Sequence, residues 1–182
     1  KFNEPLAMTS GPGTDRLFVV ERYGKIFSFP NDPAVKQADL FLDLDKVIYG
    51  LALHPNFAEN GYFYVTYITD PTAELPNGTR LSRFQAKLGE PPVADPDSEK
   101  LLLEWPSGGH NGGCLKFGPD GYLYIATGDS SGIADELSTG QDISDLTASI
   151  LRIDVNHPAK GKHYSIPADN PFARRKGARG EI

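Results

Sequence analysis

The 182-residue sequence has a single cysteine, Cys114, and no apolar run close to the length of a membrane-spanning helix. One cysteine excludes an internal disulfide framework and a cysteine-rich zinc site. A membrane span needs about 18–20 consecutive apolar residues, so none is expected. Eighteen basic residues stand against 24 acidic ones, which gives a net charge of −6. Nucleic-acid binding needs a concentrated positive face, so no nucleic-acid partner is expected.

Glycine and proline are abundant instead, with 19 and 15 residues respectively. This composition is typical of proteins built from short strands and turns, and it is unusual for a helical protein. The chain begins at Lys1, without Met or an apolar leader. We therefore expect that a leader has been removed or that the chain has been trimmed.

A strand–turn–strand pattern recurs along the chain. Its clearest copies are residues 50–67 and 113–126, and a weaker copy covers residues 5–21. Asp-Gly and Asn-Gly supply the positive φ of tight hairpin turns, and the flanking residues alternate between apolar and polar. A further β-type run follows each copy, and fourth strands are expected at residues 40–44 and 101–105.

The spacing of this repeat predicts the architecture. The equivalent positions Leu17, Phe63 and Leu123 lie 46 and then 60 residues apart. Four strands recurring at about this period are typical of β-propeller blades. We therefore predict an all-β fold, a β-propeller of which about three four-stranded blades are present. The expected blades are residues 1–45, 46–108 and 109–182, the last of them incomplete.

One blade cannot bury both of its faces, so propellers close into rings of about four to eight blades. We expect the remaining blades to come from further sequence or from another chain. A self-contained β-sandwich of about ten strands is the alternative, because sandwich strands also alternate between apolar and polar residues. Two long polar loops, residues 70–80 and 128–146, are candidates for carrying function, and the second has room for a short helix at residues 143–148.

His110 is the main candidate for chemistry. It precedes Asn111 and two glycines at the entrance of an expected strand, where backbone can approach a flat ligand closely. Imidazole titrates near neutral pH, which suits a general base. The alternative is a turn residue that is hydrogen-bonded to backbone. His54, by contrast, is expected to be a structural residue at a strand end, held extended by Pro55.

Asp129 in the Gly-Asp-Ser-Ser-Gly segment allows two interpretations. Its carboxylate can bind a cation or orient a base, or it can cap its own turn through an Asx hydrogen bond. The chain has no EF-hand loop and no G-x-S-x-G elbow. No pair of histidines has the i, i+4 spacing of helical metal ligands.

Four segments, in their order and spacing, resemble the glucose/sorbosone dehydrogenase family, six-bladed propellers that use pyrroloquinoline quinone (PQQ). They are residues 50–57 (GLALHPNF), 110–113 (HNGG), 117–129 and 141–172. The resemblance covers nearly the whole chain.

The resemblance implies that His110 is the general base that takes a proton from a sugar hydroxyl while hydride passes to PQQ. It further implies a bound calcium that polarises the quinone as a Lewis acid. It places His110, Asn111, Asp129 and Ser130 at the cofactor pocket by the central opening of the ring, and it assigns no metal ligand to this chain.

The sequence also departs from the family pattern. The segment that helps to hold PQQ and calcium would begin beyond Ile182. Gly109 and Ser130 stand where some members have Asp and Gln, and the approach to Gly50 is shortened. This part of the ring alone is therefore expected to be inactive.

The resulting prediction is a PQQ-dependent oxidoreductase that oxidises an aldose sugar or a related alcohol or aldehyde and passes electrons to an external acceptor. The family similarity suggests a periplasmic or secreted protein. One alternative is a non-catalytic propeller that serves as a binding module, as in the hedgehog-interacting protein family. A calcium-dependent propeller lactonase is a third possibility.

Overall fold

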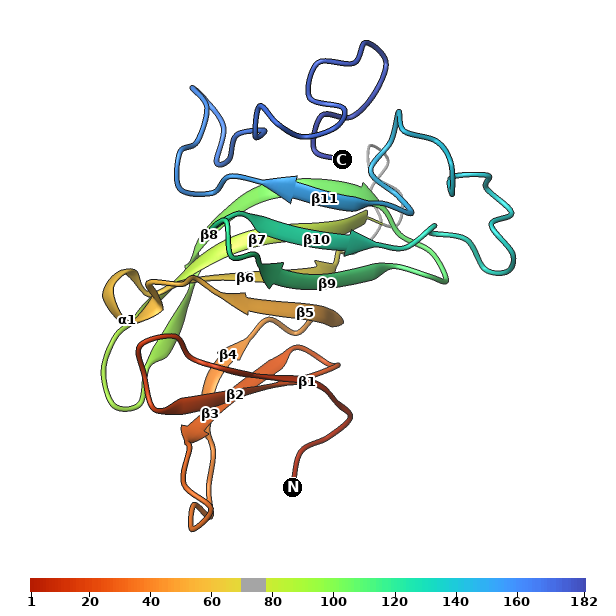
Figure 1. Cartoon of the computed structure of the whole chain (residues 1–182). Coiled ribbons are helices and arrows are strands. Elements are labelled where there is room, and N and C mark those ends of the chain that lie inside the picture. Colours follow the sequence, from red (N-terminus) through yellow and green to blue (C-terminus); the bar gives the residue numbers. More distant parts are fainter. Residues whose placement is uncertain (70–77) are drawn as a thin grey trace.

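The computed structural model describes residues 1–69 and 78–182, which form three antiparallel sheets stacked in chain order (Figure 1). Within each sheet the strands follow one another by simple antiparallel pairing. The first sheet consists of β1 (Pro5–Ser10), β2 (Arg16–Glu21), β3 (Lys25–Pro30) and β4 (Asp39–Asp43). The second consists of β5 (Ile48–Leu53), β6 (Tyr62–Ile68), β7 (Gly78–Lys87) and β8 (Val93–Pro106). The third consists of β9 (Gly112–Phe117), β10 (Leu123–Thr127) and β11 (Ile150–Ile153).

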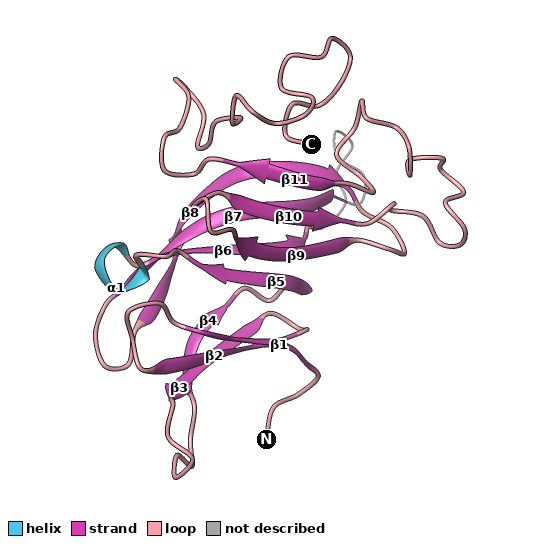
Figure 2. Ribbon diagram, in the orientation of Figure 1, coloured by secondary structure: helices cyan, strands magenta, loops and turns pink. Residues whose placement is uncertain are grey.

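The predicted all-β class is confirmed, since strands and loops make up nearly all of the described chain (Figure 2). The repeat places Leu17, Phe63 and Leu123 at the second strand of the first, second and third sheet respectively. Phe63 and Leu123 are fully buried, while Leu17 is partly exposed. The copies therefore share a topology but differ in how their faces are covered.

The second sheet is apolar on both faces because it lies between the other two. Successive residues of a strand point to opposite faces. Accordingly, Phe63 and Val65 belong to the core shared with the first sheet, while Tyr64 between them belongs to the core shared with the third. Phe18 and Phe41 contribute from the first sheet, with ring centroids 5.0 Å apart in an edge-to-face arrangement. Burial on both sides fixes the stacking of the three sheets.

The first strands of the three sheets run next to one another, β1 against β5 and β5 against β9. Gly50 of β5 allows the closest approach, because a Cβ at this position would lie 2.0 Å from the carbonyl oxygen of Gly113. The Thr66 hydroxyl donates a 2.6 Å hydrogen bond to the same oxygen. The second and third sheets are thus joined by backbone contact where β9 begins.

His54 joins the same two sheets at the opposite end of β5. Its Nδ1 accepts hydrogen bonds from the Asn56 backbone N–H at 3.0 Å and from the Asn60 amide at 2.9 Å. Since Nδ1 is an acceptor, Nε2 carries the proton and donates it to the Asn156 Oδ1 at 2.8 Å. The expected structural role is therefore seen, with the imidazole 6% exposed.

The segment after β11 follows the free edge of that strand (Figure 1). The Arg152 backbone N–H donates to the carbonyl of Glu181, while the Asn170 amide donates at 2.9 Å to the carbonyls of both Arg152 and Gly180. The Glu181 carboxylate is buried and accepts a 2.7 Å hydrogen bond from the Tyr164 hydroxyl. The last residues of the chain are thus fixed against the third sheet.

Helical structure differs from expectation. The short helix α1 (Phe57–Asn60) was not expected, whereas residues 143–148 form turns. The Asp145 carboxylate accepts from the Thr147 backbone N–H at 2.7 Å, and Asp142 does the same for Ser144 at 2.8 Å. Such side-chain bonds compete with helical ones. Of the expected loop at 70–80, residues 70–77 lie outside the described residues and 78–80 begin β7. Among the described helices, none has the length and apolar character needed to cross a membrane.

Candidate active site

Antiparallel pairing brings the two candidate segments together. His110 lies two residues before the start of β9, and Asp129 lies two residues after the end of β10. The two strands are neighbours, with Thr127 opposite Gly112 after a register shift. The backbone at Gly112 has φ of 66°, a left-handed conformation that favours glycine. The antiparallel pairing of β9 and β10 therefore brings His110 and Asp129 to the same end of the third sheet.

The loop after β10 is bonded to the segment before β9 along its backbone. The His110 N–H donates to the Ser131 carbonyl and the Ser130 N–H donates to the His110 carbonyl, both at 3.0 Å. A Cβ at Gly128 would lie 1.9 Å from the His110 carbonyl oxygen, and one at Gly109 would lie 2.5 Å from that of Ser131. A side chain at position 109 would therefore require the facing backbone at Ser131 to shift.

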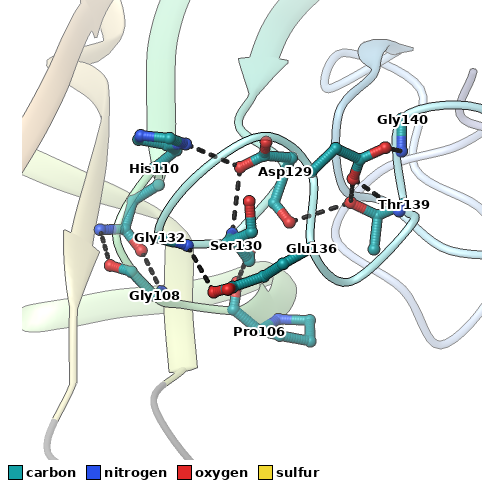
Figure 3. Close-up of polar contacts among 12 residues, drawn as sticks. Pro106, Gly108, His110, Asp129, Ser130, Gly132, Glu136, Thr139 and Gly140 are labelled. Atoms are coloured by element: carbon teal, nitrogen blue, oxygen red, sulfur yellow. Dashed lines mark hydrogen bonds and ion pairs between the residues drawn. The ribbon is translucent and has the colours of Figure 1, made fainter.

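His110 and Asp129 form a hydrogen-bonded pair (Figure 3). The imidazole Nδ1 lies 3.1 Å from the Asp129 Oδ1. The same carboxylate oxygen accepts a 3.0 Å hydrogen bond from the Ser131 N–H. The Asx turn cap is therefore seen, and the same carboxylate contacts the His110 imidazole. A role of Asp129 in binding a cation or orienting a base stays a prediction.

The electrostatics of the pair follow from these contacts. The Ser131 N–H is the main cause that lowers the pKa of Asp129 below its ordinary value, and the His110 imidazole lowers it further. The carboxylate is thus kept charged. The His110 side chain is 55% exposed, and no residue of the described ranges bonds to Nε2. A carboxylate can only accept, so Nδ1 carries the proton of this bond, and in the neutral form of the ring Nε2 is then the acceptor.

Asn111 and Ser130 are buried, and their side chains make hydrogen bonds to the chain's own backbone. The Asn111 amide accepts from the Gly108 N–H and donates to the Gly108 carbonyl, each at 2.8 Å. Ser130 has φ of 59°, and its hydroxyl donates to the Pro106 carbonyl at 2.6 Å. These contacts shape the turn that presents His110. A direct contact of either side chain with a cofactor stays a prediction.

The described residues bring one imidazole and one carboxylate together at this site. No Lys or Arg pairs with His110 or Asp129 there, although a tricarboxylate such as PQQ needs cations. Within residues 1–69 and 78–182, no group of three or more His, Cys, Asp or Glu side chains is arranged to hold a metal ion. The arrangement of imidazole and carboxylate is chemically suited to proton abstraction.

Two residues that support the site were not expected from the sequence. The Thr139 hydroxyl donates to the Asp129 carbonyl at 2.9 Å, and Asp135 accepts from the Thr139 N–H at 2.8 Å. Neither residue belongs to a motif or a periodic segment. A polar loop without regular structure gives no sequence signal for such contacts.

The stacked antiparallel sheets and the solved structures that they match define the class of protein: a β-propeller of the quinoprotein dehydrogenase type. The chain belongs to the Glucose / Sorbosone dehydrogenase family, whose model matches residues 2–182. The resemblance in the sequence and the predicted propeller class are thereby confirmed.

Relatives and solved structures match most or all of the chain's length. Human Hedgehog-interacting protein is 34% identical over 185 residues, covering 91% of this chain and 26% of that protein. The aldose sugar dehydrogenase of Escherichia coli is 24% identical over 190 residues, covering 100% and 47%. A putative glucose dehydrogenase from Thermus thermophilus is 29% identical with a TM-score of 0.72, covering 100% and 50%. The PQQ-bound aldose sugar dehydrogenase of Streptomyces coelicolor matches in fold with a TM-score of 0.72 at 23% identity, covering 98% and 49%. The chain thus spans a quarter to a half of the length of these proteins.

Proposed function

We propose that this chain carries the proton-abstracting half of a PQQ-dependent sugar dehydrogenase active site. The observation that supports the proposal is the imidazole of His110, bonded through Nδ1 to the charged carboxylate of Asp129 and open at Nε2. A general base needs an available lone pair at an accessible atom and a partner that stabilises the imidazolium after proton transfer. The His110–Asp129 pair meets both requirements.

The chain's own residues act as follows. A hydroxyl of an aldose or a related alcohol or hydrated aldehyde binds at Nε2 of His110 and transfers its proton there. Asp129 stabilises the resulting charge and prevents the ring from rotating. Bound PQQ, polarised by calcium, would supply the acceptor for the hydride that leaves the same carbon, and an external acceptor would then take up the two electrons. Rigid backbone around Gly109 and Gly128 holds the imidazole in place for this step.

The proposal extends to the setting of the protein. The dehydrogenase relatives are named as aldose sugar and glucose dehydrogenases, and one solved structure is of a PQQ-bound form. A periplasmic or secreted location fits a small-molecule sugar substrate and an external electron acceptor. The remaining blades and the cationic groups for PQQ would complete the pocket around His110.

The test is reconstitution of the full-length protein with PQQ and calcium, followed by dye reduction with a panel of aldoses. We expect aldose-dependent reduction that requires PQQ. His110→Ala should lower kcat by about 10²–10⁴-fold, the range for loss of a general base. His157→Ala is the matched control, because His157 is exposed and lies outside the site. An active H110A protein would show that the base is another group.

A binding module is the second candidate function. It is favoured by the 34% identity to Hedgehog-interacting protein, which is higher than the 24% and 28% identities to an aldose sugar dehydrogenase and a quinoprotein glucose dehydrogenase. Titration with PQQ separates the two functions, because a binding module without dehydrogenase activity is not expected to bind PQQ. Absence of PQQ binding by the full-length protein would select the binding module.

A further inference from the structure

The loop of residues 132–140 has no regular secondary structure, yet it is held by a set of side-chain hydrogen bonds to its own backbone (Figure 3). The Asp135 carboxylate accepts from the backbone N–H groups of Thr139 at 2.8 Å and Gly140 at 3.0 Å. The Glu136 carboxylate accepts from the Gly132 N–H at 3.0 Å. Two acidic side chains of the loop are therefore used to fix its own backbone.

The loop backbone adopts an unusual conformation that needs this support. Ala134, Asp135 and Ser138 have φ of 53°, 52° and 55°, in the left-handed region that residues with a Cβ rarely adopt. Backbone of this kind persists only where the surrounding contacts hold it, and it concentrates at functional sites. The conformation brings Thr139 back against Asp129, which lies just before the loop in sequence.

Thr139 makes the contact that links the loop to the site. Its hydroxyl lies 2.9 Å from the Asp129 carbonyl oxygen and 3.3 Å from the Asp135 Oδ1. A hydroxyl has a single proton, and the shorter distance assigns it to the Asp129 carbonyl. Asp129 is thus held at two points, by Thr139 at its carbonyl and by the Ser131 N–H at its carboxylate.

We infer that Thr139, fixed by Asp135, is a positioning residue that holds Asp129 in place to bond the Nδ1 of His110. The chain of contacts runs from Asp135 through Thr139 and Asp129 to the imidazole. Neither Thr139 nor Asp135 touches the substrate side of His110 in this arrangement. Their effect is on which ring nitrogen carries the proton, since the hydrogen bond made by one nitrogen sets the state of the other. The catalytic consequence rests on the proposed function, but the effect on the imidazole does not.

The experiment measures the tautomer of His110 by ¹⁵N NMR of the full chain, at a pH where the ring is neutral. Wild type is expected to hold His110 mainly as the Nδ1–H form. Thr139→Val keeps the shape but removes the hydroxyl, and should shift the ring toward the Nε2–H form. Thr139→Ser keeps the hydroxyl and should retain the wild-type tautomer. Asp135→Asn should shift it as T139V does, because a carboxylate binds two N–H groups better than a neutral amide.

A matched control separates positioning from loss of charge or of fold. Asp142 lies in the same loop region, and its carboxylate contacts Ser144. Asp142→Asn therefore removes the same charge and should leave the His110 tautomer unchanged. Unchanged amide shifts of the buried Leu123 and Ile125 show that each variant is folded. A wild-type tautomer in folded T139V would overturn the inference, as would a wild-type protein without the Nδ1–H form.

Kinetics of the full-length protein supply the second readout. If Thr139 positions the base, T139V should lower kcat about tenfold with little change in KM, because misplacement of a catalytic group acts on the chemical step. T139S should restore most of the loss. If wild type shows no PQQ-dependent activity, the proposed function fails, and the tautomer measurement still decides the role of Thr139.

Discussion

The Nδ1 of His110 and the Oδ1 of Asp129 lie 3.1 Å apart, although 19 residues separate them in sequence. The contact exists because β9 and β10 pair antiparallel, so that the residue before one strand meets the loop after the other. The same oxygen of Asp129 also accepts a hydrogen bond from the Ser131 N–H. A turn-capping carboxylate is thereby also the partner of the imidazole.

Asp129→Asn tests this double role. An Asn oxygen in the place of Oδ1 can accept from both the Ser131 N–H and the His110 Nδ1–H, so the turn should survive. The amide has no charge, however, and cannot stabilise the imidazolium that forms when His110 takes up a proton. We expect kcat to fall by about 10²–10⁴-fold, measured by dye reduction in the full-length protein with PQQ and calcium. Unchanged thermal unfolding would show that the turn is intact, and near-wild-type kcat would contradict the role of the Asp129 charge.

Much of the fold could be predicted from sequence because its signals are local. Turn residues and period-two alternation locate the strands, and recurrence at Leu17, Phe63 and Leu123 indicates equivalent sheets. The short helix for which residues 143–148 had room does not form, because Asp142 and Asp145 bond the backbone two residues ahead, a competition that periodicity does not reveal. The division into blades at 1–45, 46–108 and 109–182 stays a prediction.

The site was predictable only as separate residues. His110 and Asp129 could be named from their motifs, but the bond between them depends on strand pairing across the third sheet. The inward orientation of Asn111 and Ser130 depends on the tight packing of Gly108 against Ser130, where a Cβ would lie 1.8 Å from the Ser130 carbonyl oxygen. Such contacts arise from the tertiary structure, and single-residue patterns do not contain them.

Gly50→Ala should destabilise the contact between the second and third sheets. The added Cβ would lie 2.0 Å from the Gly113 carbonyl oxygen and 2.7 Å from the Thr66 hydroxyl. Rigid backbone cannot yield as a flexible side chain does, so we expect a loss of about 1–3 kcal/mol in the free energy of unfolding. Chemical denaturation measures it. Gly89→Ala is the control, because its Cβ would meet only the Pro91 carbonyl oxygen at 3.7 Å. Equal stability of the two variants would contradict the close approach of β5 and β9.

His54 and Asn156 should show coupled effects on stability. Their 2.8 Å hydrogen bond links the end of β5 to the segment after β11, and the imidazole is buried. A double-mutant cycle with His54→Ala and Asn156→Ala should give a coupling energy of about 0.5–1.5 kcal/mol, the net value of a typical hydrogen bond. Urea unfolding of the four proteins provides the data. Additive effects would mean that the bond contributes nothing to holding the sheets together.

Tyr67 should make the protein sensitive to alkaline pH. Burial in the core between the first and second sheets, together with its hydrogen bond to Glu99, raises the pKa of Tyr67 to about 12. The neutral phenol is favoured in the folded state. The stabilisation that comes from this raised pKa is therefore complete below the unfolded value of about 10 and is lost as pH rises from there through about 12. Tyr67→Phe cannot ionise at this position, so the difference in unfolding free energy between wild type and Y67F should be constant from pH 7 to about 9 and shrink above about 10. Denaturation curves across this range measure the difference. Parallel curves up to pH 12 would show that the phenol gains no protection from its burial, which is incompatible with the buried position of Tyr67 and its hydrogen bond to Glu99.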